Sequence, residues 1–283
     1  MSPADRDRAE LHALTRALRA HLRRRRSAGQ RLTRVRVPVP EPDRVPVPAA
    51  DRVPVPVTDP APSEPTPRTE PATLETRAAG IRRLAAAAPD LETLRSAVAE
   101  CTACELCKSR TQTVFADGAG ARRVMFIGEA PGFHEDREGV PFVGPAGRLL
   151  TDIIERGMGI PRSEVTIANV LKCRPPDNRD PTRDEKTLCT GWLDRQIELV
   201  DPLVLIALGR HAAGHLLASE ASMGKMRGKV HERAGRKVVA TYHPAFLLRS
   251  PEMKKECWKD IQLAMRELGL ARPGEARESG KPR

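Results

Sequence analysis

The stretch RVMFIGEAPG, residues 123–132, decides the fold class of this chain. Its first half is continuously apolar from Val124 to Ile127, which is typical of a parallel strand buried on both faces of a sheet. Its second half breaks into Gly, Glu and Pro, which indicates a turn at the carboxyl end of that strand. Three further runs have the same character: VTIANVLKC at 165–173, LVLIALG at 203–209 and KVVATYHPA at 237–245. We therefore expect four strands.

Segments with a helical spacing of apolar residues lie between and beyond these runs. They predict helices over 147–156, 184–200, 212–218 and 253–268, and an earlier helical region carries Leu84, Leu91 and Leu94. The alternation predicts a three-layer α/β/α domain over residues 73–270, with a central, mainly parallel four-stranded sheet. Because ligands bind at the carboxyl ends of such strands, we expect the turns at 128–132, 169–176 and 243–244 to line one pocket.

The first 72 residues differ in composition from the rest. Leu11, Leu14, Leu18 and Leu22 have helical spacing, so residues 1–30 are expected to form a short, basic amphipathic helix. Residues 31–72 repeat RVPVP every eight residues, a proline-rich composition that favours a disordered linker. A docking stretch for a proline-recognising protein partner is the alternative role for this extension. Residues 271–283 are expected to form a flexible tail.

The charge of the chain indicates its partner. A net charge of +11 favours a polyanion such as DNA, because clustered Lys and Arg gain affinity by releasing phosphate counterions. A basic surface that only maintains solubility is the alternative. The N-terminus has no apolar signal segment and no run of 18 apolar residues occurs, so we expect a cytoplasmic protein without a membrane span.

The cysteines indicate a metal or redox site, because disulfides are not expected in a reducing compartment. Cys101 and Cys104 form a C-x2-C pair, and Cys173 and Cys189 form a second pair 16 positions apart. Four thiolates from two segments can bind a tetrahedral zinc ion or a [4Fe-4S] cluster, and the spacing does not separate the two. Cys257, in the last expected helix, is interpreted as a buried free thiol.

Three motifs together resemble the family-4 uracil-DNA glycosylases, bacterial and archaeal enzymes that carry a [4Fe-4S] cluster. They are GEAPGFHEDREGVPFVGPAGRLL at 128–150, IANVLKCRPPDNRDPT at 167–182 and TYHPAFLLR at 241–249. The resemblance covers about residues 94–270. It implies a monomeric enzyme with the uracil-DNA glycosylase fold that hydrolyses the N-glycosidic bond of uracil in single- or double-stranded DNA. This reaction starts base excision repair.

The resemblance also implies which residues bind the cluster. By position, the ligands are Cys101, Cys104, Cys173 and Cys189, whereas Cys107 stands where relatives often carry a His and is expected not to be a ligand. The cluster would then brace the segment that leads from Asn169 to Cys173.

The uracil site implied by the resemblance comprises Gly128, Glu129, Ala130, Pro131, Gly132, Phe142, Asn169 and His243. An Asn amide places a donor beside an acceptor, so Asn169 can pair with O4 and N3–H of uracil and leave groups of cytosine unpaired. Phe142 resembles the aromatic residue that stacks on a uracil rotated out of the helix. The structural alternatives are an Asn that ends a strand and a Phe of the core.

The catalytic residues implied are His243 and a carboxylate. His243 can donate a hydrogen bond to uracil O2 as negative charge grows on the leaving base. The best-known uracil glycosylases orient water with an Asp where this chain has Ala130; Glu129 and Glu135 are the available carboxylates, and the choice between them stays open. DNA contacts are expected from apolar wedges and a cation in the segment after His243, namely Phe246, Leu247, Leu248 and Arg249. The structural alternative is that these residues simply begin the last helix.

Two other functions stay open. One relative of this family traps uracil-DNA covalently through a His in a basic loop after the proline turn, but RPPDNRDPTRDE at 174–185 contains no His, so turnover is favoured. A non-catalytic iron-sulfur module that binds DNA or carries electrons would require the pocket motifs to be incidental.

Overall fold

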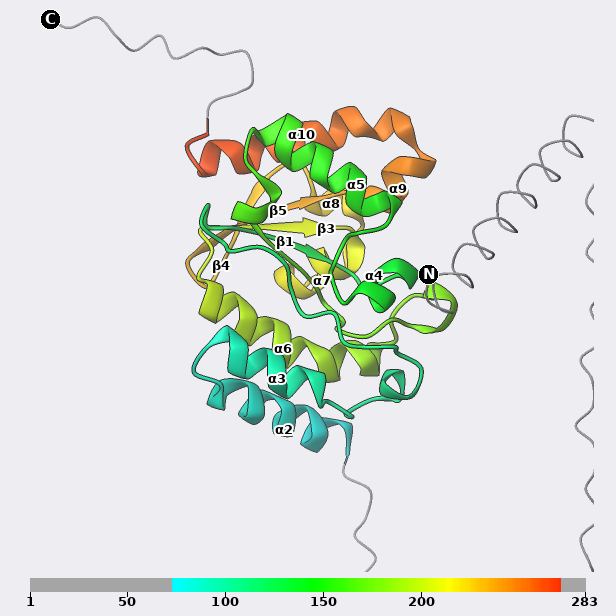
Figure 1. Cartoon of the computed structure of the whole chain (residues 1–283). Coiled ribbons are helices and arrows are strands. Elements are labelled where there is room, and N and C mark those ends of the chain that lie inside the picture. The colour runs from blue at the N-terminus through cyan, green and yellow to red at the C-terminus, as the bar shows by residue number, and fades with distance from the viewer. Residues whose placement is uncertain (1–72, 271–283) are drawn as a thin grey trace, which may run out of the picture. The chain divides into compact units, whose positions relative to one another are not determined.

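A computed structural model of the chain describes residues 73–270, which form an α/β domain around a five-stranded sheet in the order β2-β1-β3-β5-β4 (Figure 1). The four expected strands are present and pair in parallel: β1 (Val124–Gly128), β2 (Thr166–Asn169), β3 (Val204–Leu208) and β5 (Arg236–Thr241). The expected number of four strands is wrong, because β4 (Val230–Arg233) pairs antiparallel with β5 at the edge. Its sequence VHER is short, largely polar and only partly buried, as is usual for an edge strand.

Successive residues of the central strands face two separate hydrophobic cores. In β1, Val124 and Phe126 belong to one core, and Met125 and Ile127 belong to the other. The two cores lie on opposite faces of the sheet, under two groups of helices (Figure 1). The first group is α5 (Pro145–Asp152), α9 (Pro244–Arg249) and α10 (Lys254–Glu267), and the second is α6 (Arg183–Val200), α7 (Arg210–Leu217) and α8 (Met223–Met226). The expected three layers are therefore confirmed.

Two helices at the start of the described domain form a further layer outside α6. Their helical character was predicted from the sequence, but this layer was not. These are α2 (Leu74–Ala87) and α3 (Leu91–Ala99), drawn in cyan in Figure 1. They bury Ile81 and Leu94 against Trp192 of α6. The chain then continues through η1 (Glu105–Lys108) into β1, so this layer places the C-x2-C segment beside α6.

The four long helices predicted after β1 are observed, with α5 continuing into the π-helical turn η2 (Ile153–Met158). Short elements were missed because three to six residues are too few to show a helical period. They are α4 (Phe133–Glu138), α8 and α9, together with η3 (Arg162–Glu164), η4 (Pro176–Asn178) and η5 (Pro251–Met253).

The start of α6 fixes the loop that precedes it. Thr182 Oγ1 accepts a hydrogen bond from the Glu185 amide at 3.2 Å, and the Glu185 carboxylate accepts one from the Thr182 amide at 2.8 Å. Arg179 donates to both oxygens of Glu185, at 2.9 and 2.6 Å. The loop is therefore tied to the helix on both sides of Asp180.

Within residues 73–270, no helix combines the length and the apolar character needed to cross a bilayer. The helix expected over 1–30, the linker over 31–72 and the tail over 271–283 lie outside the described residues.

Candidate active site at the carboxyl edge of the sheet

A cavity of about 430 Å³ opens at the carboxyl ends of β1, β2 and β5. Residues of all three turns that were expected to converge line it, and this prediction is confirmed. Glu135 lines it as well. The predicted uracil-site residues that line it are Glu129, Ala130, Pro131, Gly132, Phe142, Asn169 and His243.

Gly128 and Asn169 are register partners where β1 and β2 end. A Cβ atom at Gly128 would overlap both the Asn169 amide and the Phe142 ring, so the glycine allows these two side chains to meet. Asn169 is only 1 % exposed, and its Oδ1 has no hydrogen-bond partner among the described residues. A buried acceptor left unpaired costs about 1–3 kcal/mol, and a bound N–H donor would relieve that cost.

Phe142 reaches the cavity from a backbone conformation that non-glycine residues rarely adopt. Its φ is 57°, in the left-handed region, and its side chain is buried beside His243 with ring centroids 5.5 Å apart. The first turn of α5 packs directly on this residue, since a Cβ atom at Gly147 would overlap the carbonyl group of Phe142. Such strain persists only where surrounding structure imposes it, and it is common in ligand sites.

His243 caps the N-terminus of α9 and has a defined tautomer. Its Nδ1 accepts a hydrogen bond from the Ala245 amide at 3.1 Å, which leaves the proton on Nε2. Burial, reinforced by the positive charge of Arg249, lowers the pKa of His243 to about 4. At neutral pH the side chain is therefore an uncharged imidazole with one N–H donor.

The two candidate carboxylates have different surroundings. Glu135 accepts three backbone hydrogen bonds, from Gly132 at 3.1 Å and from Val143 and Gly144 at 3.0 Å each. Both of its oxygens are therefore engaged in tying the turn after β1 to the segment that carries Phe142. Val143 and Gly144 are eight and nine positions away from Glu135 along the chain, so sequence spacing did not reveal these two donors.

The Glu129 carboxylate, in contrast, accepts no hydrogen bond from the residues that the structure describes. Burial and, next, the negative charge of Asp180 raise its pKa to about 7, while Arg210 and Lys186 oppose the shift. A carboxylate with a pKa near the working pH is well suited to accept a proton. Asp180 and His211 lie beside it, and neither was predicted from the sequence as a site residue.

The segment after His243 divides between core and surface. Phe246 and Arg249 line the cavity, and Leu248 is 45 % exposed. Leu247 departs from the expected DNA-contacting position, because its side chain is 1 % exposed and packs in the core beneath α9. One residue in a short helix must face the sheet, and here it is Leu247.

A second, small cavity is lined by the four cysteines that the resemblance implied, Cys101, Cys104, Cys173 and Cys189. Cys107 is not among the residues that line this cavity, and Cys257 is buried in a different core, as expected for a free thiol. Burial raises the pKa of Cys104 to about 11 and that of Cys189 to about 12. Thiols of this kind lose their protons on binding a metal centre, so the donor set fits a thiolate-bound group.

Two cations border the cysteine cavity. Arg110 donates to Cys173 Sγ at 3.2 Å and to the Cys101 carbonyl at 2.8 Å, so it connects the two halves of the cysteine set. Lys172 is fully buried; its Nζ donates to the Asn169 carbonyl at 2.7 Å and to the Gln196 side chain. One lysine, which was not predicted from the sequence, thus lines the cysteine cavity and holds the backbone of Asn169.

Comparison with known proteins agrees with this geometry. The sequence profile of the uracil DNA glycosylase superfamily matches residues 115–262. The type-4 uracil-DNA glycosylase of Sulfurisphaera tokodaii is 42 % identical over 188 residues, which cover 64 % of this chain and 85 % of the relative. That of Saccharolobus solfataricus is 42 % identical, covering 61 % and 84 %, and that of Thermotoga maritima is 43 % identical, covering 62 % and 92 %.

The family profile includes all three turns of the cavity as well as Cys173 and Cys189, and it ends within α10. Fold, cavity and sequence identity therefore lead to one assignment. The chain belongs to the type-4 uracil-DNA glycosylases of the uracil DNA glycosylase superfamily, enzymes that hydrolyse N-glycosyl bonds.

Proposed function

We propose that the cavity receives a deoxyuridine rotated out of DNA and that the chain hydrolyses its N-glycosidic bond, leaving an abasic site for base excision repair. The observation that carries this proposal is the buried, unpaired Oδ1 of Asn169 at the cavity wall. An acceptor in that position matches the N3–H of uracil, and the amide N–H beside it matches O4. Cytosine would present a bare N3 and an amino group, which leaves both sides unpaired.

Phe142 and His243 complete the proposed base site. The Phe142 ring offers a face on which a flat base can stack, and its strained backbone holds that face in place. The Nε2–H of His243 would donate to uracil O2 and strengthen as negative charge develops there. A neutral imidazole can do this without adding a positive charge beside Arg249.

Glu129 is the carboxylate that we assign to the attacking water. Glu135 has both oxygens occupied by backbone N–H groups, so its role in this proposal is to hold the turn and the Phe142 segment together. Glu129 has free oxygens and a pKa near neutrality. These properties support a role for Glu129 as the base that activates a water nucleophile.

For the cofactor, we propose a [4Fe-4S] cluster held by Cys101, Cys104, Cys173 and Cys189, in line with the thiol-lined cavity and the type-4 relatives. Its contribution would be a rigid brace between the segment after Cys101 and the segment after Asn169. Lys172 and Arg110 supply positive charge beside the thiolates. Flanking DNA would meet the exposed side chains Leu248 and Arg249.

Release of free uracil from a single-stranded oligonucleotide with one uracil tests the proposed function. We expect multiple turnovers, free uracil and an abasic strand that breaks on heating in alkali. A stoichiometric protein–DNA adduct that survives denaturation would instead support covalent trapping. Binding of the strand without release or adduct would support a non-catalytic module.

A further inference from the structure

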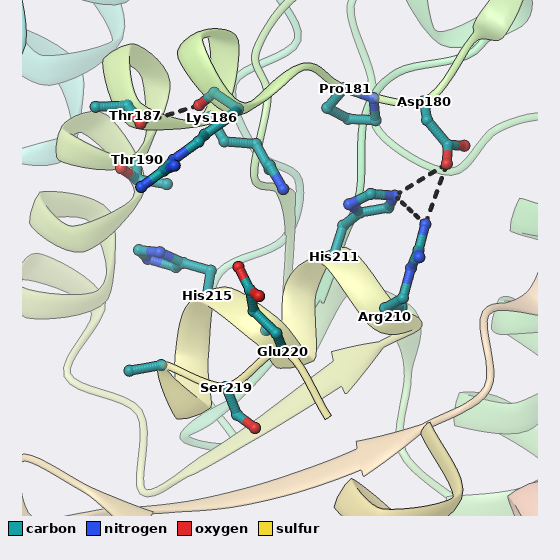
Figure 2. Close-up of a pocket in the computed structure, with 13 residues that line it drawn as sticks. Asp180, Pro181, Lys186, Thr187, Thr190, Arg210, His211, His215, Ser219 and Glu220 are labelled. Atoms are coloured by element: carbon teal, nitrogen blue, oxygen red, sulfur yellow. Dashed lines mark hydrogen bonds and ion pairs between the residues drawn. The ribbon is translucent and has the colours of Figure 1, made fainter. Parts of the chain in front are cut away.

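Three side chains from separate segments meet beside the candidate active site: Glu129 after β1, Asp180 before α6 and His211 in the first turn of α7. Over residues 73–270, they form the one group of three or more His, Cys, Asp or Glu side chains whose potential ligand atoms all lie within 4.8 Å. Asp180 lines the uracil cavity and also a neighbouring cavity of about 720 Å³ between α6 and α7. Figure 2 shows Asp180, His211 and Arg210 pointing toward one another in this cavity between α6 and α7.

His211 is placed between the two carboxylates. Its Nε2 lies 3.6 Å from Glu129 Oε2 and 3.5 Å from Asp180 Oδ2, and only 11 % of its side chain is exposed. These separations are longer than normal hydrogen bonds, and Arg210 Nη2 lies 3.5 Å from the same ring nitrogen. Arg210 Nη2 donates to Asp180 Oδ2 at 3.2 Å and holds the carboxylate on the His211 side (Figure 2).

The charges around Glu129 come from several elements. Asp180 raises its pKa, whereas Arg210 on α7 and Lys186 on α6 lower it. Burial, with Lys186 and Arg210, lowers the pKa of His211, so this ring is neutral at neutral pH. The other charged or titratable side chains of the uracil cavity are Glu135, Arg179, His243 and Arg249.

A bound cation is a less suitable explanation for this group. Arg210 already pairs with Asp180, and the positive charges of Arg210 and Lys186 act on Glu129. Both would repel a divalent ion placed between the carboxylates. All of these neighbours are instead consistent with a role in setting the pH at which Glu129 takes up a proton.

We propose that Asp180 and His211 are positioning residues for Glu129: Asp180, anchored by Arg210, holds the His211 ring against Glu129 and keeps that carboxylate ready to take a proton from the attacking water. This inference rests on the proposed function. In the step concerned, the water oxygen bonds to C1′ and the C1′–N1 bond breaks, with its electron pair remaining on uracil. One water proton passes to Glu129 and then to solvent.

The test is the pH dependence of single-turnover uracil release by the full chain. Asp180→Asn removes a negative charge that raises the pKa of Glu129, so ionised Glu129 persists to lower pH. The acid limb of the profile should therefore move down by roughly 0.5–1 pH unit. The plateau rate should fall about threefold to tenfold, because the remaining base is weaker.

Asp184→Asn is the matched control. It removes the same charge from an exposed residue in the first turn of α6, outside the group, and should keep the wild-type acid limb. His211→Ala should lower the plateau rate, whereas His211→Gln, which retains a neutral N–H donor of similar reach, should retain most of it. Because Asp180 is 71 % exposed, its substitution is not expected to affect folding, and thermal unfolding verifies this.

The outcomes separate this inference from the proposed function. If Glu129→Gln keeps the wild-type rate and pH profile, Glu129 is not the base. The assignment of Glu129 to the attacking water and the positioning role of Asp180 and His211 are then both wrong. If Glu129→Gln abolishes the acid limb while Asp180→Asn behaves like Asp184→Asn, the base is correct and the positioning role is overturned. Identical plateau rates for His211→Ala and wild type would also overturn it.

Discussion

Asn169 and Gly128 show how much at this site depends on single atoms. The glycine has no Cβ atom, so the amide and the Phe142 ring share one space at the end of β1. The amide is buried by this arrangement, yet its oxygen remains unpaired within the described residues. Selectivity in a buried site comes from such groups, since the wrong ligand leaves them unpaired.

Asn169→Asp is expected to change base selectivity. The carboxylate loses the donor that pairs with uracil O4 and presents an acceptor to the amino group of cytosine. Uracil release should therefore fall by about 10²-fold or more, and weak cytosine release should appear. Single-turnover rates on matched uracil- and cytosine-containing strands measure both effects, and an Asn169→Asp enzyme with full uracil selectivity would refute the role of the amide.

Residues of the site were predictable from sequence to different degrees. Asn169, Phe142 and His243 lie in motifs that resemble a known family, and the cavity brings them together. The choice between Glu129 and Glu135 required the backbone donors of Val143 and Gly144, which come from a different loop. Asp180, His211 and Lys172 were missed because each has a partner on a distant element, and a single polar residue at a loop, helix start or strand end carries no distinctive pattern.

At the scale of elements, α5 is the helix that fixes Phe142. Gly147→Ala should force the helix and the Phe142 carbonyl apart, lowering stability by roughly 1–3 kcal/mol and weakening uracil release. Gly80→Ala in α2 is the matched control, because a Cβ atom there meets nothing within 4 Å, and it should stabilise the fold by up to about 1 kcal/mol. Thermal unfolding and excision rates measure both. Equal behaviour of the two variants would show that the packing of α5 on Phe142 is unimportant.

The segment from β2 to α6 connects the proposed cluster to the base site. Cys173→Ser should abolish the brown colour and visible absorbance of the purified protein and should lower uracil release, because the Asn169 segment loses its brace. Cys257→Ser is the control; Cys257 belongs to α10 and its thiol lies in a core away from the four proposed ligands, so colour and activity should persist. A colourless, zinc-loaded and fully active wild-type protein would exclude the cluster.

Strands were easier to predict than short helices and the edge strand. β1, β2 and β3 are buried along their whole length and β5 over its last four residues, because helices cover both faces of the sheet. β4 pairs on one side only and has a polar sequence, so nothing in its composition distinguishes it from a loop. The layer formed by α2 and α3 was predicted as helical, but its position outside α6 depends on Trp192 and could not be read from spacing.

At the scale of the whole molecule, we propose that base excision belongs to residues 73–270 alone. The family profile and the cavity both fall inside this range, and the proline-rich segment has few residues that could build a core. A chain that begins at Ala72 should release uracil at low salt at the full-length rate. At higher salt it should lose affinity for DNA if the basic run 23–26 contributes phosphate contacts. Failure of the shortened chain to release uracil at low salt would assign part of the site to the extension.

We propose that the cavity at the carboxyl edge of the sheet releases uracil by stabilising charge on the leaving base. The most direct test compares His243→Ala with wild type in single-turnover uracil release and in DNA binding. We predict a chemical step slower by roughly 10²–10³-fold, the usual effect of removing one such donor, with nearly unchanged binding. An unaltered chemical step in His243→Ala would contradict it.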